Sequence, residues 1–434
     1  MGDTIFALSS APGRAGVAVI RVSGPAARDV LERLCGDVPE PRQAALRRLS
    51  DGEPIDQALV LWFPGPRSFS GEDMAEFHVH GGRAIVGRAL QAMGRAPGCR
   101  PAEPGEFTRR AVENGKFDLT QAEAIIDLID AETEAQRCQA LRQYGGELEN
   151  LYEGWRTELI KSLAWAEAEI DFSDEALPGD VLQRTRGKVS EIIKQIQIHI
   201  DDSRRGEIVR DGFFLTVIGP PNAGKSSLIN AFAKRDVAIV AETAGTTRDV
   251  IEVRLNIGGY VVIVADTAGL RQAADAVESE GVRRALARAE QSDLVLLLVD
   301  SSLNDPMAGL SAETLAKADL IVWNKADLPS LTPREGLKLS LKTGAGLDVL
   351  LAVIERRVAE RLDLGRESPV LTRARHRHAL EQALAALRRG LDARDAELFA
   401  EDLRLATRAI GRITGRVDVE ELLDVVFRDF CIGK

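Results

Sequence analysis

Residues 219–227, with the sequence GPPNAGKSS, have the types and spacing of a phosphate-binding loop. They fit the pattern G-x-x-x-x-G-K-S/T, in which backbone N–H groups and a helix N-terminus create a positive potential for phosphate oxygens. The lysine adds a point charge near the β and γ phosphates, and we also expect it to act in catalysis. The following serine offers its hydroxyl to Mg²⁺. We therefore predict that one run of residues binds a nucleoside triphosphate: Asn222, Ala223, Gly224, Lys225, Ser226 and Ser227.

Further elements follow in the order found in GTPases. DTAG, at 266–269, comes after an apolar run, and its Asp and Gly suit Mg²⁺ and the γ-phosphate. NKAD, at 324–327, fits the guanine-reading N-K-x-D element, and SLK, at 340–342, resembles a weaker fifth element. Adenine would leave the Asp acceptor unpaired, at a cost of about 1–3 kcal/mol, so GTP is predicted. The expected contacts are Asp266, Thr267, Ala268, Gly269, Asn324, Lys325, Asp327, Ser340, Leu341 and Lys342.

The segment AGTTRD, at 244–249, lies between the first two of these elements. Its Thr247 resembles the threonine that binds Mg²⁺ in GTPase switch segments. The residue after DTAG is Leu270, where Ras-type GTPases carry a glutamine that orients the attacking water. An apolar side chain cannot orient water, so another group is needed. Glu278 is the candidate, and a solvated position in a polar stretch is the alternative that the residues alone favour.

Length and composition limit the class of protein. A chain of 434 residues exceeds one hydrophobic core and is expected to form two or three domains. The chain carries a net charge of −11, which argues against bulk coating of nucleic acid but leaves a local basic face possible. No apolar run reaches membrane-spanning length, and the N-terminus lacks the pattern of a secretory signal. The four cysteines are widely spaced, which favours a reducing cytoplasm over disulfides or structural zinc.

The first 117 residues read as a separate α+β domain. Strands are predicted at 4–8, 17–22, 57–63 and 75–80, the last alternating between apolar and polar side chains. A helix should follow Gly81 and Gly82, with an apolar stripe from Ile85 to Met93. His78 and His80 share the polar face of the last strand. A polar face without a metal is the preferred interpretation, because no third ligand is evident nearby.

A helical region is predicted on both sides of the GTPase elements. Asp118 and Gln121 have the spacing of a capping box, and Ile125, Ile126 and Ile129 should form the buried face of the helix that follows. Further apolar stripes run over 151–170 and 189–200, and helices are expected at 378–388, 398–410 and 418–430. Arginines gather between 373 and 394. Contact with nucleic-acid phosphates and a solvated helix face are both open for them.

Three long stretches, DTIFALSSAPGRAGVAVIRVSG, SFSGEDMAEFHVHGG and PGEFTRRAVENGKFDLTQAEAI, resemble the N-terminal domain of the MnmE (TrmE) family of tRNA-modification GTPases. The C-terminal CIGK is similar to the signature of that family, so the resemblance covers essentially the whole chain. It implies a homodimer whose N-terminal domain binds a tetrahydrofolate derivative, either methylene- or formyl-tetrahydrofolate. Matched by motif, the folate-binding residues would be Arg21, Glu76, Lys116 and Lys434. Cys431 would lie near the pocket as a candidate catalytic residue. A solvated charge is the alternative for Arg21, Glu76 and Lys116, and a small buried apolar residue is the alternative for Cys431.

The resemblance also implies potassium-dependent hydrolysis, with Glu278 matching the family's catalytic glutamate. The K⁺ ligands would be the Asn222 side chain, Thr246, and the backbone carbonyls of Ala241 and Thr243. Mg²⁺ would be held by Ser226 and Thr247. A flavin-dependent partner, MnmG, would act with the chain on carbon 5 of the wobble uridine of certain tRNAs, giving (carboxymethyl)aminomethyl-uridine. The rival class is a regulatory or ribosome-assembly GTPase, which would carry an RNA-binding module after its GTPase domain.

The expected architecture follows from both lines of argument. A P-loop GTPase domain with a doubly wound, mostly parallel sheet is inserted into a helical domain, and a folate-binding-type α+β domain precedes both. The boundaries are 1–117 for the N-terminal domain, 118–210 and 364–434 for the two parts of the helical domain, and 211–363 for the GTPase domain. A linker is expected at 362–370.

Overall fold

The computed structural model divides the chain into two compact units. It describes residues 2–171, 181–202, 204–235, 237–239, 252–265, 290–308, 310–329, 336–362, 369–417, 423, 426–427 and 430–433. The first unit comprises Met1–Ile126, Gln143–Ile193 and Ala379–Lys434. The second comprises Asp127–Arg142 and Lys194–His378. The predicted domain boundaries at 117, 210 and 363 divide the chain into more parts than these two units, and they stay a prediction.

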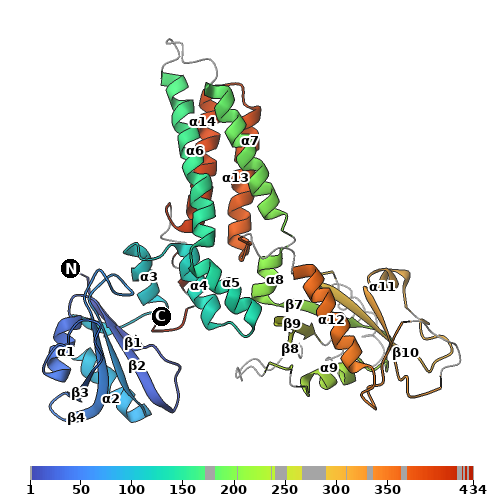
Figure 1. The fold of residues 1–434 in the computed structure, drawn as a ribbon, viewed down its shortest axis with the longest axis horizontal. Coiled ribbons are helices and arrows are strands. Elements are labelled where there is room, and N and C mark those ends of the chain that lie inside the picture. The colour runs from blue at the N-terminus through green and yellow to red at the C-terminus, as the bar shows by residue number, and fades with distance from the viewer. Residues whose placement is uncertain are drawn as a thin grey trace, which may run out of the picture. The chain divides into compact units, whose positions relative to one another are not determined.

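The first unit contains a six-stranded sheet in the order β3-β4-β5-β2-β1-β6 (Figure 1). Its neighbouring strands are antiparallel except β1 and β6, which run parallel. The strands are β1 (Thr4–Leu8), β2 (Ala15–Ser23), β3 (Ala45–Ser50), β4 (Pro54–Phe63), β5 (Met74–Gly81) and β6 (Cys99–Pro101). The helices of this region are α1 (Ala27–Cys35), α2 (Arg83–Gly94) and α3 (Glu106–Glu113).

One face of this sheet is covered by α1 and α2. Their apolar residues join those of the central strands in one core, which includes Leu31, Met93, Ile20 and Phe77. The predicted alternation along β5 is confirmed, since Ala75, Phe77 and Val79 are buried while Glu76 and His78 are half-buried and His80 is exposed. The polar side chains of β5 therefore belong to the sheet face opposite this core.

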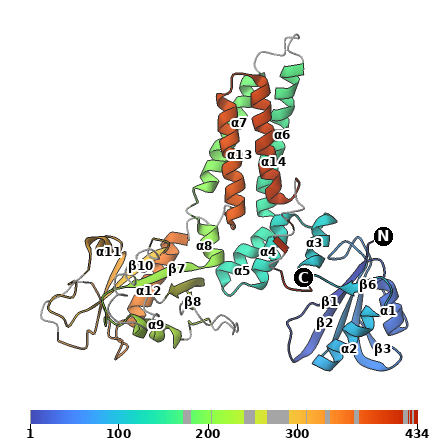
Figure 2. The same ribbon diagram turned by 180° about the vertical axis from the view of Figure 1, so that it is seen from behind.

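Helices form most of the rest of the first unit, and some of them extend past its limits at Ile126, Ile193 and Ala379. They are α4 (Leu119–Ile129), α6 (Glu147–Asp171), α7 (Val181–Ile200), α13 (Ala374–Asp392) and α14 (Ala396–Thr414), and α6 and α14 run side by side in both views (Figure 2). The predicted capping box is confirmed, because the Gln121 N–H donates to Asp118 Oδ1 at 2.7 Å and Gln121 Oε1 accepts from the Asp118 N–H at 3.0 Å. The predicted buried face of α4 is wrong at Ile129, which is exposed. The helix instead buries Leu119, Ala122 and Ala124.

The second unit contains a six-stranded sheet in the order β12-β11-β10-β7-β9-β8. All its pairs are parallel except β8 with β9. The strands are β7 (Phe213–Ile218), β8 (Glu252–Ile257), β9 (Tyr260–Ala265), β10 (Leu294–Asp300), β11 (Leu320–Asn324) and β12 (Leu337–Lys338). The unit also holds α8 (Arg205–Asp211), α9 (Lys225–Ala233), α11 (Ala312–Ala316), α12 (Leu347–Leu362) and most of α5 (Glu134–Tyr144).

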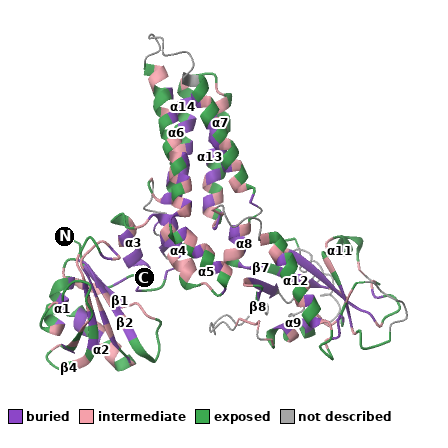
Figure 3. Cartoon of the chain, viewed as in Figure 1, coloured by how far each residue is buried: buried purple, intermediate pink, exposed green. Residues whose placement is uncertain are grey.

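Both faces of this second sheet are buried. All seven residues of β10 are buried, and the strands of this sheet are coloured largely as buried in Figure 3. Separate apolar clusters flank the sheet, one with Leu228 and Leu350 and the other with Val295 and Trp323. Burial on two faces explains why the parallel strands are continuous apolar runs rather than alternating ones. Among the described helices, none is long and apolar enough to cross a lipid bilayer.

Candidate functional sites

The predicted phosphate loop links the end of β7 to the start of α9. Lys225 is the first residue of α9, and its Nζ donates to the carbonyl oxygens of Gly219 at 2.8 Å and Pro220 at 2.9 Å. The loop needs unusual backbone angles, with φ of +60° at Asn222 and +105° at Gly224. Both Ser226 and Ser227 lie exposed in the first turn of α9. The backbone is thus wound around the N-terminus of a helix, which suits a phosphate group.

Asn324 joins the phosphate loop to the two base-reading elements. This buried side chain donates from Nδ2 to the Ala223 carbonyl at 2.7 Å and accepts at Oδ1 from the Leu341 N–H at 3.3 Å. Three stretches that are far apart in sequence therefore meet at one side chain. A Cβ on Gly224 would lie 2.4 Å from Asn324 Nδ2, so the loop backbone can approach this closely only with glycine.

Asp327 is held as a carboxylate next to this junction. The Ser340 hydroxyl donates to Asp327 Oδ1 at 2.6 Å, and this hydrogen bond lowers the pKa of Asp327. An ionised carboxylate accepts two hydrogen bonds, as the donor edge of guanine requires. The arrangement of Asp327 and Ser340 therefore fits a guanine base. Lys342, the last residue of that element, is exposed.

Asp300 is a further residue of this sheet edge that the sequence interpretation missed. It ends β10, and its Oδ2 accepts from Lys325 Nζ at 2.5 Å. Burial alone would raise the pKa of Asp300, but hydrogen bonds from Lys325 and Ser302 outweigh that effect and lower it. The ion pair fixes the lysine of NKAD, which directly follows the neighbouring strand β11. A sequence signal existed, because Asp300 closes an apolar run just as Asn324 closes the next one.

The remaining nucleotide and cation predictions fall outside the described residues. They are Ala241, Thr243, Thr246, Thr247, Asp266, Thr267, Ala268, Gly269, Leu270 and Glu278. The residues that flank them are described. Glu252 of β8 and Ala265 of β9 are register partners, so the strand ends next to the two predicted cation-binding segments lie side by side.

The second candidate site lies on the first sheet, on the face opposite the α1–α2 core. Arg21 of β2 and Glu76 of β5 are register partners, and their side chains form an ion pair with Arg21 Nη2 2.9 Å from Glu76 Oε1. Each side chain is less than a fifth exposed. His78 Nε2 lies 3.4 Å from the other Glu76 oxygen, whereas His80 contacts Asp56 instead. The predicted Arg21 and Glu76 are thus brought together by strand register.

Aromatic rings complete this site and were not predicted. The Arg21 guanidinium lies 5.1 Å from the ring centroid of Phe69 and 5.9 Å from that of Phe107. Lys116 does not reach the ion pair in the described contacts, and its Nζ donates to the Pro66 carbonyl at 2.9 Å. It therefore holds the loop that carries Phe69. Flat rings beside a guanidinium and a carboxylate suit a planar heterocycle with hydrogen-bonding edges.

The C-terminal tail packs on this same domain. Ile432 forms a β-bridge with Pro104, the Gly105 N–H donates to the Cys431 carbonyl at 3.3 Å, and the Ser9 hydroxyl donates to the Gly433 carbonyl at 2.8 Å. Gly433 has φ of +97°, and a Cβ there would lie 2.2 Å from the carbonyl oxygen of Leu8.

Two of the tail's residues need separate comment. Cys431 is exposed, so it is not the buried apolar residue that the sequence allowed as an alternative. Lys434 lies outside the described residues.

Comparison with known proteins gives full-length matches. The family model for the MnmE helical domain matches residues 119–431, and that for the GTP-binding protein TrmE N-terminus matches residues 4–116. The tRNA modification GTPase MnmE of Parvibaculum lavamentivorans is 55% identical over 100% of both chains, and that of Paramagnetospirillum magneticum is 53% identical over 100% of both. The mitochondrial 5-taurinomethyluridine tRNA synthase subunit GTPB3 of Homo sapiens is 48% identical over 100% of this chain and 94% of its own. The chain therefore belongs to the MnmE (TrmE) family of tRNA modification GTPases.

Proposed function

We propose that this chain is a potassium-dependent GTPase that modifies carbon 5 of the wobble uridine of certain tRNAs to (carboxymethyl)aminomethyl-uridine. It would act as a homodimer in the cytoplasm with the flavin-dependent partner MnmG, and a tetrahydrofolate derivative would donate the carbon. The observation that carries the GTPase half is the junction at Asn324, which ties the phosphate loop to the base-reading elements through Ala223 and Leu341. The names of the full-length relatives support the tRNA half.

The residues around the phosphate loop fit a guanine nucleotide with Mg²⁺ and K⁺. Lys225 and the N-terminus of α9 would neutralise phosphate charge, while Asp327 would accept from the guanine edge. When bound, Mg²⁺ and K⁺ supply positive charge for the negative charge that develops on the phosphate oxygens. Ser226 and Thr247 would hold Mg²⁺. The K⁺ ligands would be Asn222, Thr246 and the carbonyls of Ala241 and Thr243.

Hydrolysis further requires a residue that orients water, because Leu270 cannot. We assign this role to Glu278, which matches the family's catalytic glutamate. Asp266 to Gly269 would meet the metal and the γ-phosphate. In this arrangement the phosphate loop binds GTP, whereas other side chains set the rate of its cleavage. Mutations can therefore change the rate of hydrolysis without changing the affinity for GTP.

The folate half of the proposal rests on Arg21, Glu76 and the rings beside them. A pterin ring offers N–H donors to the Glu76 carboxylate, and the anionic glutamate tail of folate suits Arg21 or Lys116. Arg21 and Glu76 already form a charge pair on the sheet, so a ligand must replace their mutual hydrogen bonds with equally good ones. Cys431 and Lys434 would contribute from the tail.

The test is nucleoside mass spectrometry on tRNA incubated with this chain, MnmG, methylenetetrahydrofolate, GTP and potassium. We expect a modified wobble uridine in the complete reaction. Omitting GTP, or using Lys225→Ala, should abolish it. Potassium-stimulated GTP hydrolysis without any change in the tRNA would instead favour the regulatory or ribosome-assembly class.

A further inference from the structure

The hairpin of β8 and β9 carries the flanks of both predicted cation-binding segments. Glu252 and Ala265 pair at one end of it, next to the segments that contain Thr247 and Asp266 in the sequence. The chain before the first segment is also fixed to β8, because the Ile239 N–H donates to the Arg254 carbonyl at 2.8 Å. The described residues 239 and 252, on either side of that segment, are therefore both positioned by the same strand.

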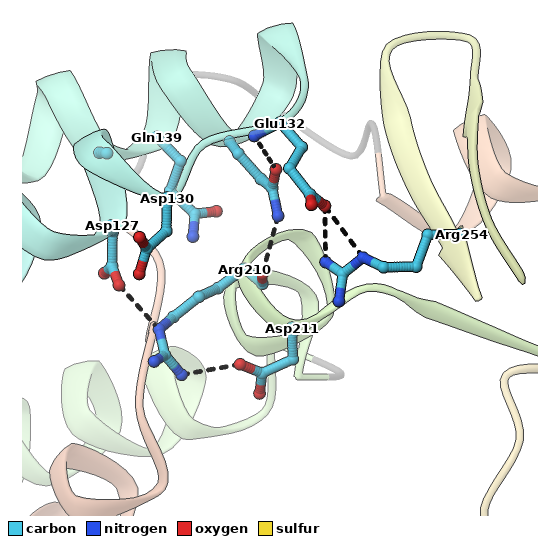
Figure 4. Close-up of a pocket in the computed structure, with 9 residues that line it drawn as sticks. Asp127, Asp130, Glu132, Gln139, Arg210, Asp211 and Arg254 are labelled. Carbon is cyan, nitrogen blue, oxygen red and sulfur yellow. Dashed lines mark hydrogen bonds and ion pairs between the residues drawn. The ribbon is translucent and has the colours of Figure 1, made fainter. Parts of the chain in front are cut away.

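The same hairpin is bound to the first turn of α5 and to the segment that leads into it. The Ala135 N–H donates to the Gly259 carbonyl at 3.1 Å, in the β8–β9 turn. The Glu132 carboxylate lies 2.7 Å from Arg254 Nη2 and 2.9 Å from its Nε (Figure 4). Arg254 thus uses its carbonyl to hold Ile239 and its guanidinium to hold Glu132.

Hydrogen bonds fix the backbone of Glu132. The buried Gln136 accepts at Oε1 from the Glu132 N–H at 2.9 Å and donates from Nε2 to the Arg210 carbonyl at 2.9 Å. Arg210 and Arg373 both bind Asp127, at 2.9 Å and 2.7 Å. Figure 4 shows Asp127, Arg210 and Asp211 forming a chain of contacts beside the Glu132–Arg254 pair. The backbone of Glu132 is therefore fixed by hydrogen bonds, while its side chain extends to the hairpin.

The Glu132–Arg254 contact is too exposed to stabilise the fold strongly. The Arg254 and Glu132 side chains are 36% and 28% exposed, and they line a polar cavity of about 480 Å³. Exposed ion pairs contribute about 0.2–1 kcal/mol, so breaking this one should leave the protein folded. Breaking the pair should instead change the position of β8 relative to Gln136 and Asp127.

We propose that Glu132 is a positioning residue for GTP hydrolysis that acts through Arg254 and strand β8. The pair sets the position of the strand ends from which the cation-binding and γ-phosphate-binding segments start. This inference rests on the proposed roles of Thr246, Thr247 and Asp266–Gly269. GTP affinity, which the phosphate loop and Asp327 supply, should depend little on the pair.

The test uses the full chain with Glu132→Arg, Arg254→Glu and the double exchange. Coupling of about 0.5–2 kcal/mol corresponds to a fall in kcat of about 2–30-fold in each single variant, with the KM for GTP nearly unchanged. The double exchange should recover most of the rate, because it restores an ion pair of reversed polarity. Hydrogen exchange at residues 252–257 should be faster in the single variants and slower again in the double variant.

The control reverses an exposed pair within α1, a helix of the first unit. Arg28 and Glu32 lie 3.1 Å apart in that helix, so Arg28→Glu with Glu32→Arg should change neither rate nor exchange. Unchanged kcat in the single variants, or a double variant as slow as the single ones, would overturn the proposal. If the unaltered chain hydrolyses no GTP, the proposed function itself fails. Hydrogen exchange at 252–257 would then report only whether the Glu132–Arg254 pair holds β8.

Discussion

The sheet of the second unit offers its candidate site at the carboxyl ends of parallel strands, whereas the sheet of the first unit offers side chains from the face of antiparallel strands. In the second unit, β7, β10 and β11 end at Ile218, Asp300 and Asn324, so loops meet at one edge. In the first unit, Arg21 and Glu76 meet because β2 and β5 are in register. One site is largely made of backbone and loops, and the other of side chains placed by pairing.

The difference determines what a local stretch of sequence reveals. A loop that wraps a phosphate needs glycine, lysine and serine at fixed spacing, so the motif is contiguous. A pair across two strands has no fixed spacing, because the intervening connection can have any length. The contact of the tail has no fixed spacing either, since the Gly433 carbonyl accepts from Ser9 at the other end of the chain. Mutations should therefore separate the two sites cleanly, and the predictions below run from the largest expected effect to the smallest.

Deleting Cys431–Lys434 should abolish tRNA modification and leave potassium-stimulated GTPase activity within a few-fold of normal. The tail packs on Pro104, Gly105 and Ser9 of the first unit, whereas the residues proposed for GTP hydrolysis run from Gly219 to Lys342 in the second. Both activities and folate binding are measured on the truncated protein. Intact modification would refute a site shared by the tail and the first sheet. Loss of both activities would mean that the tail is needed for folding, and Ser9→Ala, which removes one hydrogen bond, should reduce modification only in part.

Replacing potassium with sodium should slow GTP hydrolysis by about 10³-fold or more, if K⁺ supplies the charge that an arginine finger supplies elsewhere. Sodium is smaller and would fit poorly among Asn222, Thr246 and two carbonyls. Folate binding at the first sheet should not change, which separates the two regions. Turnover rates in the two salts, at equal ionic strength, decide the matter. Equal rates would rule out a potassium site.

Much of this could be read from the sequence, and the limits have physical reasons. The phosphate loop, NKAD and SLK were predicted from residue types and spacing, and β1 was predicted with its observed bounds because it is a short apolar run. Phe69 was missed because its ring meets Arg21 only after folding, and Asp300 was missed although it closes an apolar run as Asn324 does. Ile129 was assigned to a buried face because helical periodicity shows which residues share a side, but not which side meets a core.

Asp327→Asn should shift nucleotide preference from GTP toward xanthosine triphosphate by about 1–3 kcal/mol, or roughly 5–150-fold. The amide replaces one acceptor with a donor, which matches the acceptor that xanthine has in place of the guanine amino group. Ser340 can still bond the amide oxygen, so the loop should keep its shape. Competition binding with the two nucleotides measures the shift. Ser340→Ala serves as the control, since it removes the bond to residue 327 without changing the base-reading group.

One titratable group in each unit should make the free energy of unfolding respond to pH in opposite directions. Burial raises the pKa of Asp118, in the first unit, to about 7, although hydrogen bonds from Gln121 and Thr120 favour its carboxylate. Burial, followed by the charges of His376 and Arg377, lowers the pKa of His199, in the second unit, to about 4. The ordinary values are 3.8 and 6.5. Each group thus titrates differently in the folded and unfolded chains.

Between about pH 4 and 7 the folded chain holds more protons at Asp118 than the unfolded chain does, so this group makes the free energy of unfolding fall as pH rises. Between about pH 4 and 6.5 the unfolded chain holds more protons at His199 than the folded chain does. This group therefore makes the free energy of unfolding rise as pH rises and fall as pH falls. Asp118→Asn should therefore gain stability relative to the parent on going from pH 5 to 7, and His199→Gln should lose it. Each change should be about 1–2 kcal/mol. Thermal unfolding at both pH values measures it, and parallel curves for parent and variant would show that the group does not titrate differently on folding.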